Sequence, residues 1–392
     1  MSLIYPPIQV TYIYLKFFKQ GVMFEIIDKI LEEQGGLCLT LITTTHRTSP
    51  ARRLDPILMK QWSERAVVLI NTNYASHPDK NLLIKNLLRM IDTIDYNHLK
   101  EGVGLFISKD IQELIHFPFP VTEKVEVDNR FLVRDLQYLK QVKKEYLVLS
   151  VGKKKLRAFK GDGDELVEII NADFPVIFND DYDYASPVRG TSFGLNAGKD
   201  FEKDKSIINQ IRMKDFYRSA DQLVHNSLKE DQSLVVYGDQ KEVSAYLEIT
   251  QDGDKVVEKV FSRYGAKGDA KLKSMAKIKI KNSQKNRNRK IVAGIRELPV
   301  HKVTIGLGGV WKAAYLGEGK QLVIEKDFSK RGYLSGDGSK LMLRRPASKD
   351  YIFIKDAVEN VLKLVKDLGG EIIFLDNGEL RDLDRIALIK RY

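Results

Sequence analysis

The pattern of hydrophobic and polar residues along the first third of the chain alternates between helix-like spacing and short strand-like apolar runs. Residues 24–33 place apolar side chains every three or four positions, which predicts an amphipathic helix, and the Gly35-Gly36 pair directly after it is typical of a helix end. A continuous apolar run at residues 37–43 predicts a buried strand. We therefore expect an α/β domain over residues 23–140. Its further expected elements are helices at 56–71 and 80–94 and a hairpin of strands at 102–108 and 111–117.

The middle of the chain changes to strand periodicity. Three short apolar segments, at residues 145–151, 154–160 and 165–170, are separated by glycine-containing turns, which predicts a three-stranded meander whose first, most apolar strand is central. A long loop follows at 171–201, and loops of this length inside a compact domain are usually functional or disordered. Apolar spacing then predicts a long helix at 205–228. These elements make up an expected central domain, residues 141–230.

The last region, residues 231–392, again alternates strands and helices. It begins with the apolar segment 233–238, and its last helix, 354–368, carries an apolar stripe. Gly369-Gly370 stand directly after that stripe and before the strand-like segment EIIFL, so we interpret them as a turn from helix to strand and not as catalytic residues. Residues 385–392 are predicted to form a strand that ties the end of the chain into a sheet.

Residues 1–22 contain an apolar stretch that is interrupted by Lys16, Lys19 and Gln20, so it is too short to span a membrane. The peptide from Lys19 to Val22 can be encoded by a purine-rich ribosome-binding sequence just upstream of an ATG codon. We hypothesise that Met23 is the true start and that residues 1–22 are a mis-assigned extension.

Composition adds a single cysteine and an uneven charge. Cys38 is alone, which excludes an internal disulfide and fits a reducing cytoplasm, where we expect the protein. The formal net charge is +11, and residues 267–290 carry ten Lys or Arg against one Asp. A localised basic segment predicts a surface that binds a polyanion, because phosphate contacts release counterions. A solvated helix that only aids solubility is the alternative interpretation.

Several short motifs occur in an order that resembles one family. They are TTTHRTSP with LDPI, GVGLFIS before FPFPVTEKVEVDNRFLVRDL, YLVLSV with KLRAFKGD, LVVYG after the long helix, and LGGEIIFL with IALIKRY. From Phe24 to Tyr392 the chain thereby resembles the bacterial archaeo-eukaryotic release factor family, relatives of the archaeo-eukaryotic peptide-chain release factor and Pelota, and within it the third subfamily. The resemblance implies a mixed α/β chain of three modules, the central one RNase H-like and the last similar to kink-turn-binding ribosomal proteins. It also implies the ribosome or tRNA as a partner.

Release by the eukaryotic and archaeal relatives rests on a Gly-Gly-Gln tripeptide in the central domain. The glycines let the backbone enter the crowded peptidyl transferase centre, and the glutamine helps to place the attacking water. No Gly-Gly-Gln occurs in this sequence, and RGTSFGLNAGKD stands in the central loop instead. The stop-codon motif Asn-Ile-Lys-Ser is also absent from the first domain. We therefore expect an RNA-binding protein and not an enzyme with release chemistry.

Other catalytic and metal-binding patterns are missing from the sequence. The six histidines include no His-x-x-x-His pair, and the sequence contains neither Gly-x-Ser-x-Gly nor a phosphate-binding glycine loop. Asp180, Asp181 and Asp183 form a local acidic cluster, which we interpret as a solvated turn and not as a two-metal site. We expect no catalytic residue, metal or cofactor.

One loop in the first domain is a weaker candidate for phosphate contact. His46 and Arg47 stand close in sequence to Arg52 and Arg53, and these cations together could meet a phosphate group. An ordinarily solvated loop histidine is the interpretation that we favour.

The candidate RNA-binding residues are cations in two places. One set occupies the basic segment, where the alternation in KIKIK leaves a helix and a short strand both open. The second set flanks the central loop, whose Tyr182, Tyr184 and Phe193 could stack on bases, although packing roles are favoured for them. The candidates are Lys271, Lys273, Lys277, Lys279, Lys281, Lys285, Arg287, Arg289 and Lys290 in the first set, and Arg189, Lys199, Lys203 and Lys205 in the second.

The function that we predict is that of a ribosome- or tRNA-associated RNA-binding protein, with ribosome rescue, hibernation and translation quality control as candidate settings. A membrane partner is not expected. Two alternatives stay open: an RNA-directed or peptidyl-tRNA hydrolase that uses the central loop, and a non-catalytic protein that binds an acidic partner.

Overall fold

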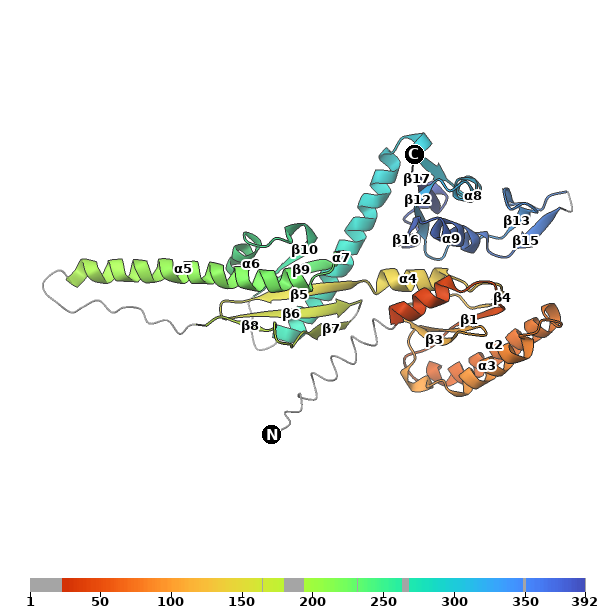
Figure 1. Cartoon of the computed structure of the whole chain (residues 1–392), viewed down its shortest axis with the longest axis horizontal. Coiled ribbons are helices and arrows are strands. Elements are labelled where there is room, and N and C mark those ends of the chain that lie inside the picture. Colours follow the sequence, from red (N-terminus) through yellow and green to blue (C-terminus); the bar gives the residue numbers. More distant parts are fainter. Residues whose placement is uncertain are drawn as a thin grey trace. The chain divides into compact units, whose positions relative to one another are not determined.

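The structure is a computed structural model that describes residues 23–163, 165–179, 194–230, 232–262, 268–347 and 350–391. The chain divides by compactness into two units (Figure 1). The first unit includes Lys143–Asn288, and the second combines Phe18–Val142 with Arg289–Tyr392. Both contain helices and sheets, so the predicted mixed α/β class is confirmed.

The first unit is built on one mixed sheet in the order β10-β9-β5-β6-β7. The predicted meander is confirmed and its first strand is central, because β5 pairs with β6 on one side and with β9 on the other. Strand β9 runs parallel to β5, and β10 runs parallel to β9, as in the RNase H-like fold that the resemblance implies. The strands are β5 (Glu145–Val151), β6 (Lys155–Asp162), β7 (Glu165–Glu168), β8 (Val176–Ile177), β9 (Ser233–Gly238) and β10 (Val256–Phe261).

One strand of the central sheet comes from the segment that we expected to open the third region. The segment 233–238 was assigned to the third region, whereas β9 hydrogen-bonds directly to β5. The central sheet therefore extends through residue 261, past the expected boundary at residue 230. The cause is the parallel pairing of β9, which needs a long helical crossover and so separates paired strands widely along the chain.

Helices cover both faces of this sheet. Leu147 and Leu149 point into a core that α5 (Gly194–Ser227) and α6 (Gln240–Leu247) cover. Tyr146 and Val148, one position out of phase, point into a second core under the first turns of α7 (Gly268–Glu297). Helix α5 begins well before the expected residue 205, inside the segment predicted as a loop to residue 201. Gly194 and Gly198 are weak helix formers, which explains why this part was interpreted as a loop.

The second unit contains an antiparallel sheet in the order β3-β2-β1-β4. The predicted helix near residue 24 is confirmed over residues 23–32. Helices α2 and α3 cover one face of the sheet, whereas helix 23–32 and α4 cover the other. The predicted hairpin of β2 and β3 is confirmed. The elements are β1 (Cys38–Thr44), α2 (Asp55–Asn73), α3 (Lys80–Asp92), β2 (Gly102–Ile107), β3 (Gln112–Phe117), β4 (Lys124–Asp128) and α4 (Arg134–Val142).

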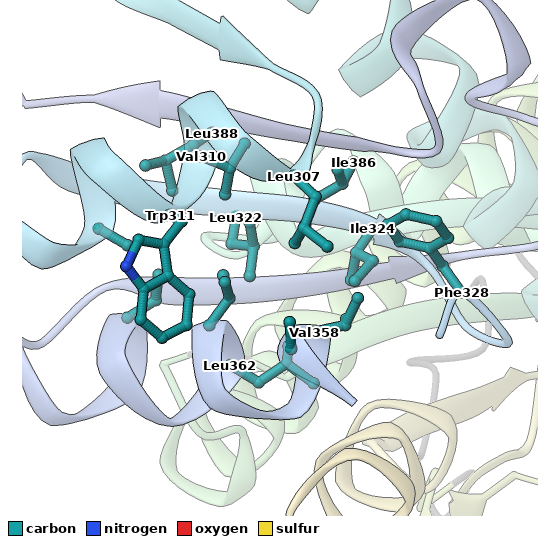
Figure 2. Close-up of a cluster of buried hydrophobic side chains, with 14 of the residues drawn as sticks. Leu307, Val310, Trp311, Leu322, Ile324, Phe328, Val358, Leu362, Ile386 and Leu388 are labelled. Atoms are coloured by element: carbon teal, nitrogen blue, oxygen red, sulfur yellow. The ribbon is translucent and has the colours of Figure 1, made fainter. Parts of the chain in front are cut away.

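The same unit has a further sheet in the order β11-β17-β12-β16 and a small sheet in the order β14-β13-β15. Figure 2 shows the core on one face of the larger sheet, where Trp311 and Val310 lie near Leu322 and Leu362. Residues Val292 and Ile295 of α7 pack on the other face. The elements are β11 (Val303–Ile305), α8 (Leu307–Tyr315), β12 (Gly319–Glu325), β13 (Gly332–Ser335), β14 (Leu341–Met342), β15 (Tyr351–Ile354), α9 (Ala357–Asp367), β16 (Glu371–Leu375) and β17 (Ile386–Lys390).

The double glycine is a turn from helix to strand, as predicted. Gly369 has φ of 72°, in the left-handed region where glycine is favoured, and the Gly370 N–H donates to the Val365 carbonyl at 2.7 Å. Strand β16 starts at the next residue. Helix α9 begins at Ala357 and not at residue 354, because the Asp356 carboxylate accepts from the Val358 N–H and caps the helix. β17 ties the end of the chain into the sheet, as expected.

Across the described ranges, no helix is both long enough and apolar enough to cross a membrane.

Candidate nucleic-acid interface

The basic segment forms a helix, which settles the alternative that the sequence left open. Helix α7 runs over Gly268–Glu297 and includes the alternating KIKIK stretch. The segment contains no proline, and lysine, arginine and alanine are among the best helix formers. The helix ends one residue before the Leu298-Pro299 pair, because the residue before a proline is disfavoured in helical geometry.

The first turns of α7 are held on the central sheet by an apolar stripe. Leu272, Ala276 and Ile280 follow one another at four-residue spacing and are buried. They pack in one core with Val148 of β5 and Val260 of β10. Because a helix that buries one face presents the rest of its surface to solvent, most of the lysines between these positions point away from the sheet.

Eight of the nine candidate cations on α7 have exposed side chains. Lys279 is the exception, because it is half-buried and its Nζ atom lies 3.5 Å from the Glu258 carboxylate of β10. Within the part of the chain that the structure describes, no carboxylate forms an ion pair with Lys273, Lys281 or Lys285. Most of the positive charge on this helix is thus presented to solvent without local neutralisation.

Four of these lysines form one row, which we name the lysine row: Lys273, Lys277, Lys281 and Lys285. Each follows the last by four residues, so they lie on neighbouring turns about 6 Å apart along the helix axis. The row is rotated away from the buried stripe. Like charges at this spacing destabilise a helix by about 0.2–0.5 kcal/mol per pair. A polyanion lying along the row would relieve that repulsion, which makes the helix suited to binding a phosphate backbone.

The described residues of the second set belong to a different helix from the lysine row. Lys199, Lys203 and Lys205 lie on α5. Arg189 lies outside the described residues, as do the candidate stacking aromatics and the acidic cluster of residues 180–183. For all of these residues the RNA-binding assignment stays a prediction.

The loop that contains His46 has more structure than an ordinary solvated loop. Asp55, at the start of α2, is fully buried and accepts from the His46 backbone N–H at 2.9 Å. The His46 Nδ1 atom lies 2.7 Å from the same carboxylate. Arg47 forms an ion pair with Glu101 at 2.9 Å, and Arg52 donates to the Asn97 carbonyl at 3.1 Å. His46, Arg47 and Arg52 therefore have local partners, and we assign no phosphate site here.

Cys38 is buried in β1, a strand of the antiparallel sheet of the second unit. Burial, with the negative charge of Glu33, raises the pKa of its thiol to about 12. The thiolate is thus disfavoured at neutral pH, as the apolar sequence around Cys38 indicated.

A pocket of about 330 Å³ opens where β5 and β9 end, beside the start of α6. Arg157 and Lys153 line it together with Glu242. Arg157 is bound to Glu168, with its Nε atom 2.6 Å from a carboxylate oxygen, and Lys153 lies 3.9 Å from Glu242. The cations of this pocket are partly compensated, so we assign no ligand to it. Among the described residues no group of three or more histidine, cysteine or carboxylate side chains is placed to hold a metal ion.

Sequence reasoning missed a second basic segment, residues 330–355, in the second unit. It contains seven Lys or Arg against two Asp, and it forms the small sheet in the order β14-β13-β15. The charge count was available from the sequence. The cross-strand contact of Tyr333 and Phe353 was not, because it depends on the pairing of β13 with β15.

One family model matches the central part of the chain. Residues 145–318 match the model of the bacterial archaeo-eukaryotic release factor family 3. The resemblance that the sequence motifs suggested, including the third subfamily, is therefore confirmed over this segment. The match begins at the first strand of the central sheet and includes the whole of α7.

Solved structures show more distant likenesses. The archaeal translation termination factor aRF1 is 13% identical, with a TM-score of 0.24 and coverage of 95% of this chain and 98% of that chain. Dom34 of S. cerevisiae, a translation termination-like factor involved in RNA quality control, is 10% identical, with a TM-score of 0.39 and coverage of 74% of both chains. Pelota of Archaeoglobus fulgidus is 12% identical, with a TM-score of 0.32 and coverage of 74% of this chain and 84% of that chain. No curated protein matches the chain. At such identities and TM-scores we draw no functional conclusion from the three structures.

Proposed function

We propose that this protein binds ribosomal or transfer RNA through the lysine row of α7 and works in translation without release chemistry. The observation that carries the proposal is the row itself: Lys273, Lys281 and Lys285 are exposed at multiples of four residues on a helix whose first turns are held by the buried stripe. The match of residues 145–318 to a release factor family supports the translational setting. Ribosome rescue, hibernation and translation quality control are the settings that we propose.

An RNA backbone fits this helix better than a membrane surface does. A helix that binds a bilayer from one side must turn an apolar face toward the lipid. The apolar face of α7 is already taken, because Leu272, Ala276 and Ile280 are buried against the sheet. What remains at the surface is a row of point charges about 6 Å apart. A regular row of this kind matches a regular polyanion better than the irregular charges of an acidic protein surface.

Release chemistry is not part of the proposal. The sequence has no Gly-Gly-Gln, and no other recognisable catalytic motif was found in it. We propose that the protein binds RNA and hydrolyses neither the RNA nor the peptidyl-tRNA ester.

Sedimentation with ribosomes at graded salt tests the proposal. Phosphate contacts make the logarithm of the binding constant fall with the logarithm of the salt concentration, by about 0.7–0.9 per contact. The triple variant Lys273→Gln, Lys281→Gln and Lys285→Gln should bind more weakly and show a slope that is smaller by about 2–3. Nuclease treatment should abolish co-sedimentation of the wild-type protein.

A matched control removes the same charge elsewhere. Lys60, Lys85 and Lys109 are exposed and lie away from α7 in sequence, so their joint replacement by glutamine lowers the net charge equally. The control should keep wild-type binding and slope. Equal losses in both triple variants would show that only net charge matters and would overturn the assignment to the lysine row. Binding that survives nuclease treatment would point to an acidic protein partner instead.

A further inference from the structure

The small sheet of residues 332–354 has one face on the core and one face away from it. Leu334 and Leu341 lie opposite each other and pack against the core that Figure 2 shows. Side chains alternate along a strand, so the neighbours of these residues point to the other side. Tyr333 of β13 and Phe353 of β15 are directly opposite each other on that side. The core-distal face of the sheet therefore carries an aromatic pair.

The aromatic pair is accessible. The ring centroids of Tyr333 and Phe353 are 5.5 Å apart with an interplanar angle of 57°, and Phe353 is 53% exposed. Tyr351 and Met342 belong to the same face by register, since they lie opposite Ser335 and Tyr333. A phenylalanine exposed to this extent on a folded surface leaves apolar area in water, which a flat apolar partner would cover.

The turn at the end of β13 is fixed to helix α8. The buried Trp311 donates its indole N–H to the Gly338 carbonyl at 3.1 Å, and the Tyr315 hydroxyl donates to the Asp337 carbonyl at 3.1 Å. Within the turn, Ser335 and Ser339 donate their hydroxyls to the Asp337 carboxylate at 2.5 and 2.7 Å. The sheet is thus preorganised, and a ligand that binds it need not order the strands first.

Exposed cations flank two strands of this sheet in the sequence. Arg331 precedes β13, Lys340 precedes β14, and Arg344 with Arg345 follows β14, all with exposed side chains. The nearby carboxylate of Asp337 is turned into its own loop by the two serine hydroxyls. The surface therefore combines flat apolar rings with positive charge, and this combination recognises unpaired nucleotides, whose bases stack while their phosphates pair.

We propose that the Tyr333 and Phe353 face of the small sheet is a second RNA site, which stacks unpaired bases, with Lys340, Arg344 and Arg345 contacting the adjoining phosphates. The inference rests on the proposed function only in taking RNA as the partner. The site lies in the second unit and uses no residue of the lysine row. Only unpaired bases can stack on the rings, so the site selects single strands, loops and bulges over continuous duplex. Stacking of this kind is tolerant of the base sequence.

Titration of the full chain with a fluorescent single-stranded RNA of about twelve nucleotides tests the site, since such a length spans one ordinary single-strand site. Replacing one base by 2-aminopurine gives a signal that is quenched when the base stacks. Phe353→Leu should weaken binding about tenfold or more and reduce the quenching. Ile352→Ala is the matched control, because Ile352 is 64% exposed on the same strand but points to the opposite face. The control should leave both affinity and quenching unchanged.

The phosphate contacts have a separate readout. Arg344→Gln combined with Arg345→Gln should lower affinity and reduce the salt dependence by about 1–2 in logarithmic slope, while quenching at saturation is retained. Circular dichroism that matches the wild type shows that these exposed substitutions have not unfolded the sheet.

The lysine-row triple variant separates the two proposals. The second site is supported if Phe353→Leu loses single-strand binding and quenching. The lysine-row triple variant should then retain quenching at saturation. Unchanged single-strand binding in Phe353→Leu, with binding lost in the lysine-row variant, would overturn this inference and leave the proposed function standing. Tighter binding of an acidic peptide than of single-stranded RNA at equal salt would also overturn it.

Discussion

At the scale of single residues, Gly161 is a position where the space for a side chain is already filled. It lies in β6 directly opposite Tyr146 of β5, whose ring is buried. A Cβ atom at Gly161 would stand 2.2 Å from the Cζ atom of that ring. The phenol ring thus covers the glycine, an arrangement that stabilises glycine positions in sheets by filling them from the neighbouring strand.

Gly161→Ala should lower the free energy of unfolding of the first unit by about 1–3 kcal/mol. The added methyl group overlaps a ring that is packed on its other sides, so either the ring or the strand must shift. Urea titration followed by far-UV circular dichroism measures the change. Gly294→Ala, in helix α7, is the control, because nothing lies within 4 Å of the new methyl group and alanine is the better helix former. It should stabilise by up to about 1 kcal/mol, and destabilisation of both variants alike would show that Tyr146 is not the cause.

At the scale of elements, α4 and α9 are joined by a buried charged contact within the second unit. Arg134, the first residue of α4, is buried and pairs with Asp356 at 2.6 Å and with Glu359 of α9 at 3.6 Å. The Glu359 carboxylate also accepts from the Arg134 backbone N–H at 3.1 Å and from that of Val133. One carboxylate therefore serves both the guanidinium and the otherwise unpaired N–H groups at the start of α4.

Glu359→Ala should destabilise the second unit by about 3 kcal/mol, because it leaves a buried guanidinium with one partner fewer and orphans two backbone N–H groups. Chemical denaturation followed by tryptophan fluorescence measures this loss. Glu371→Ala, at an exposed carboxylate in β16, is the matched control and should change stability by less than about 0.5 kcal/mol. The double variant with Arg134→Ala should lose less than the sum of the single losses. Strict additivity would mean that the two side chains do not interact.

The local pattern of hydrophobic and polar residues predicted most helices and strands, but it did not predict every pairing between strands. The meander, the first hairpin and the double-glycine turn could be predicted because each is set by residues that are neighbours in sequence. The place of β9 could not, because its pairing with β5 is parallel and follows a long crossover. The strand-like alternation in KIKIK was overridden by packing, since Ala276 and Ile280 are four residues apart and meet the sheet together.

The sequence was enough to predict where the positive charge of the candidate site lies, but it was not enough to predict the contacts of the individual side chains. The count of lysines located the basic segment, but the pairing of Lys279 with Glu258 depends on β10 lying beside α7. The same limit hid Tyr333 and Phe353, which are twenty residues apart and meet only because β13 pairs with β15. Tertiary pairing, and not composition, decides which cations and rings share a surface.

At the scale of the whole molecule, the two units have separate cores. The cores of the first unit lie on the two faces of its central sheet, and those of the second lie around its own sheets. Both tryptophans of the chain, Trp62 and Trp311, belong to the second unit. Tryptophan fluorescence therefore reports on one unit, whereas far-UV circular dichroism reports on the helices and strands of both.

We expect unfolding in two steps, because units with separate cores need not unfold together and chains of several domains often depart from two-state behaviour. Urea titration should give two transitions by circular dichroism and one by tryptophan fluorescence. Gly161→Ala should move only the transition that fluorescence does not report, whereas Glu359→Ala should move the one that it does. Coincident transitions by both probes, shifted equally by either variant, would show that the cores are energetically one. The lysine row and the Tyr333 face would then belong to a single cooperative body, and a variant at either site could affect the other through stability alone. Two independent transitions would instead let each RNA site be tested without disturbing the fold of the other.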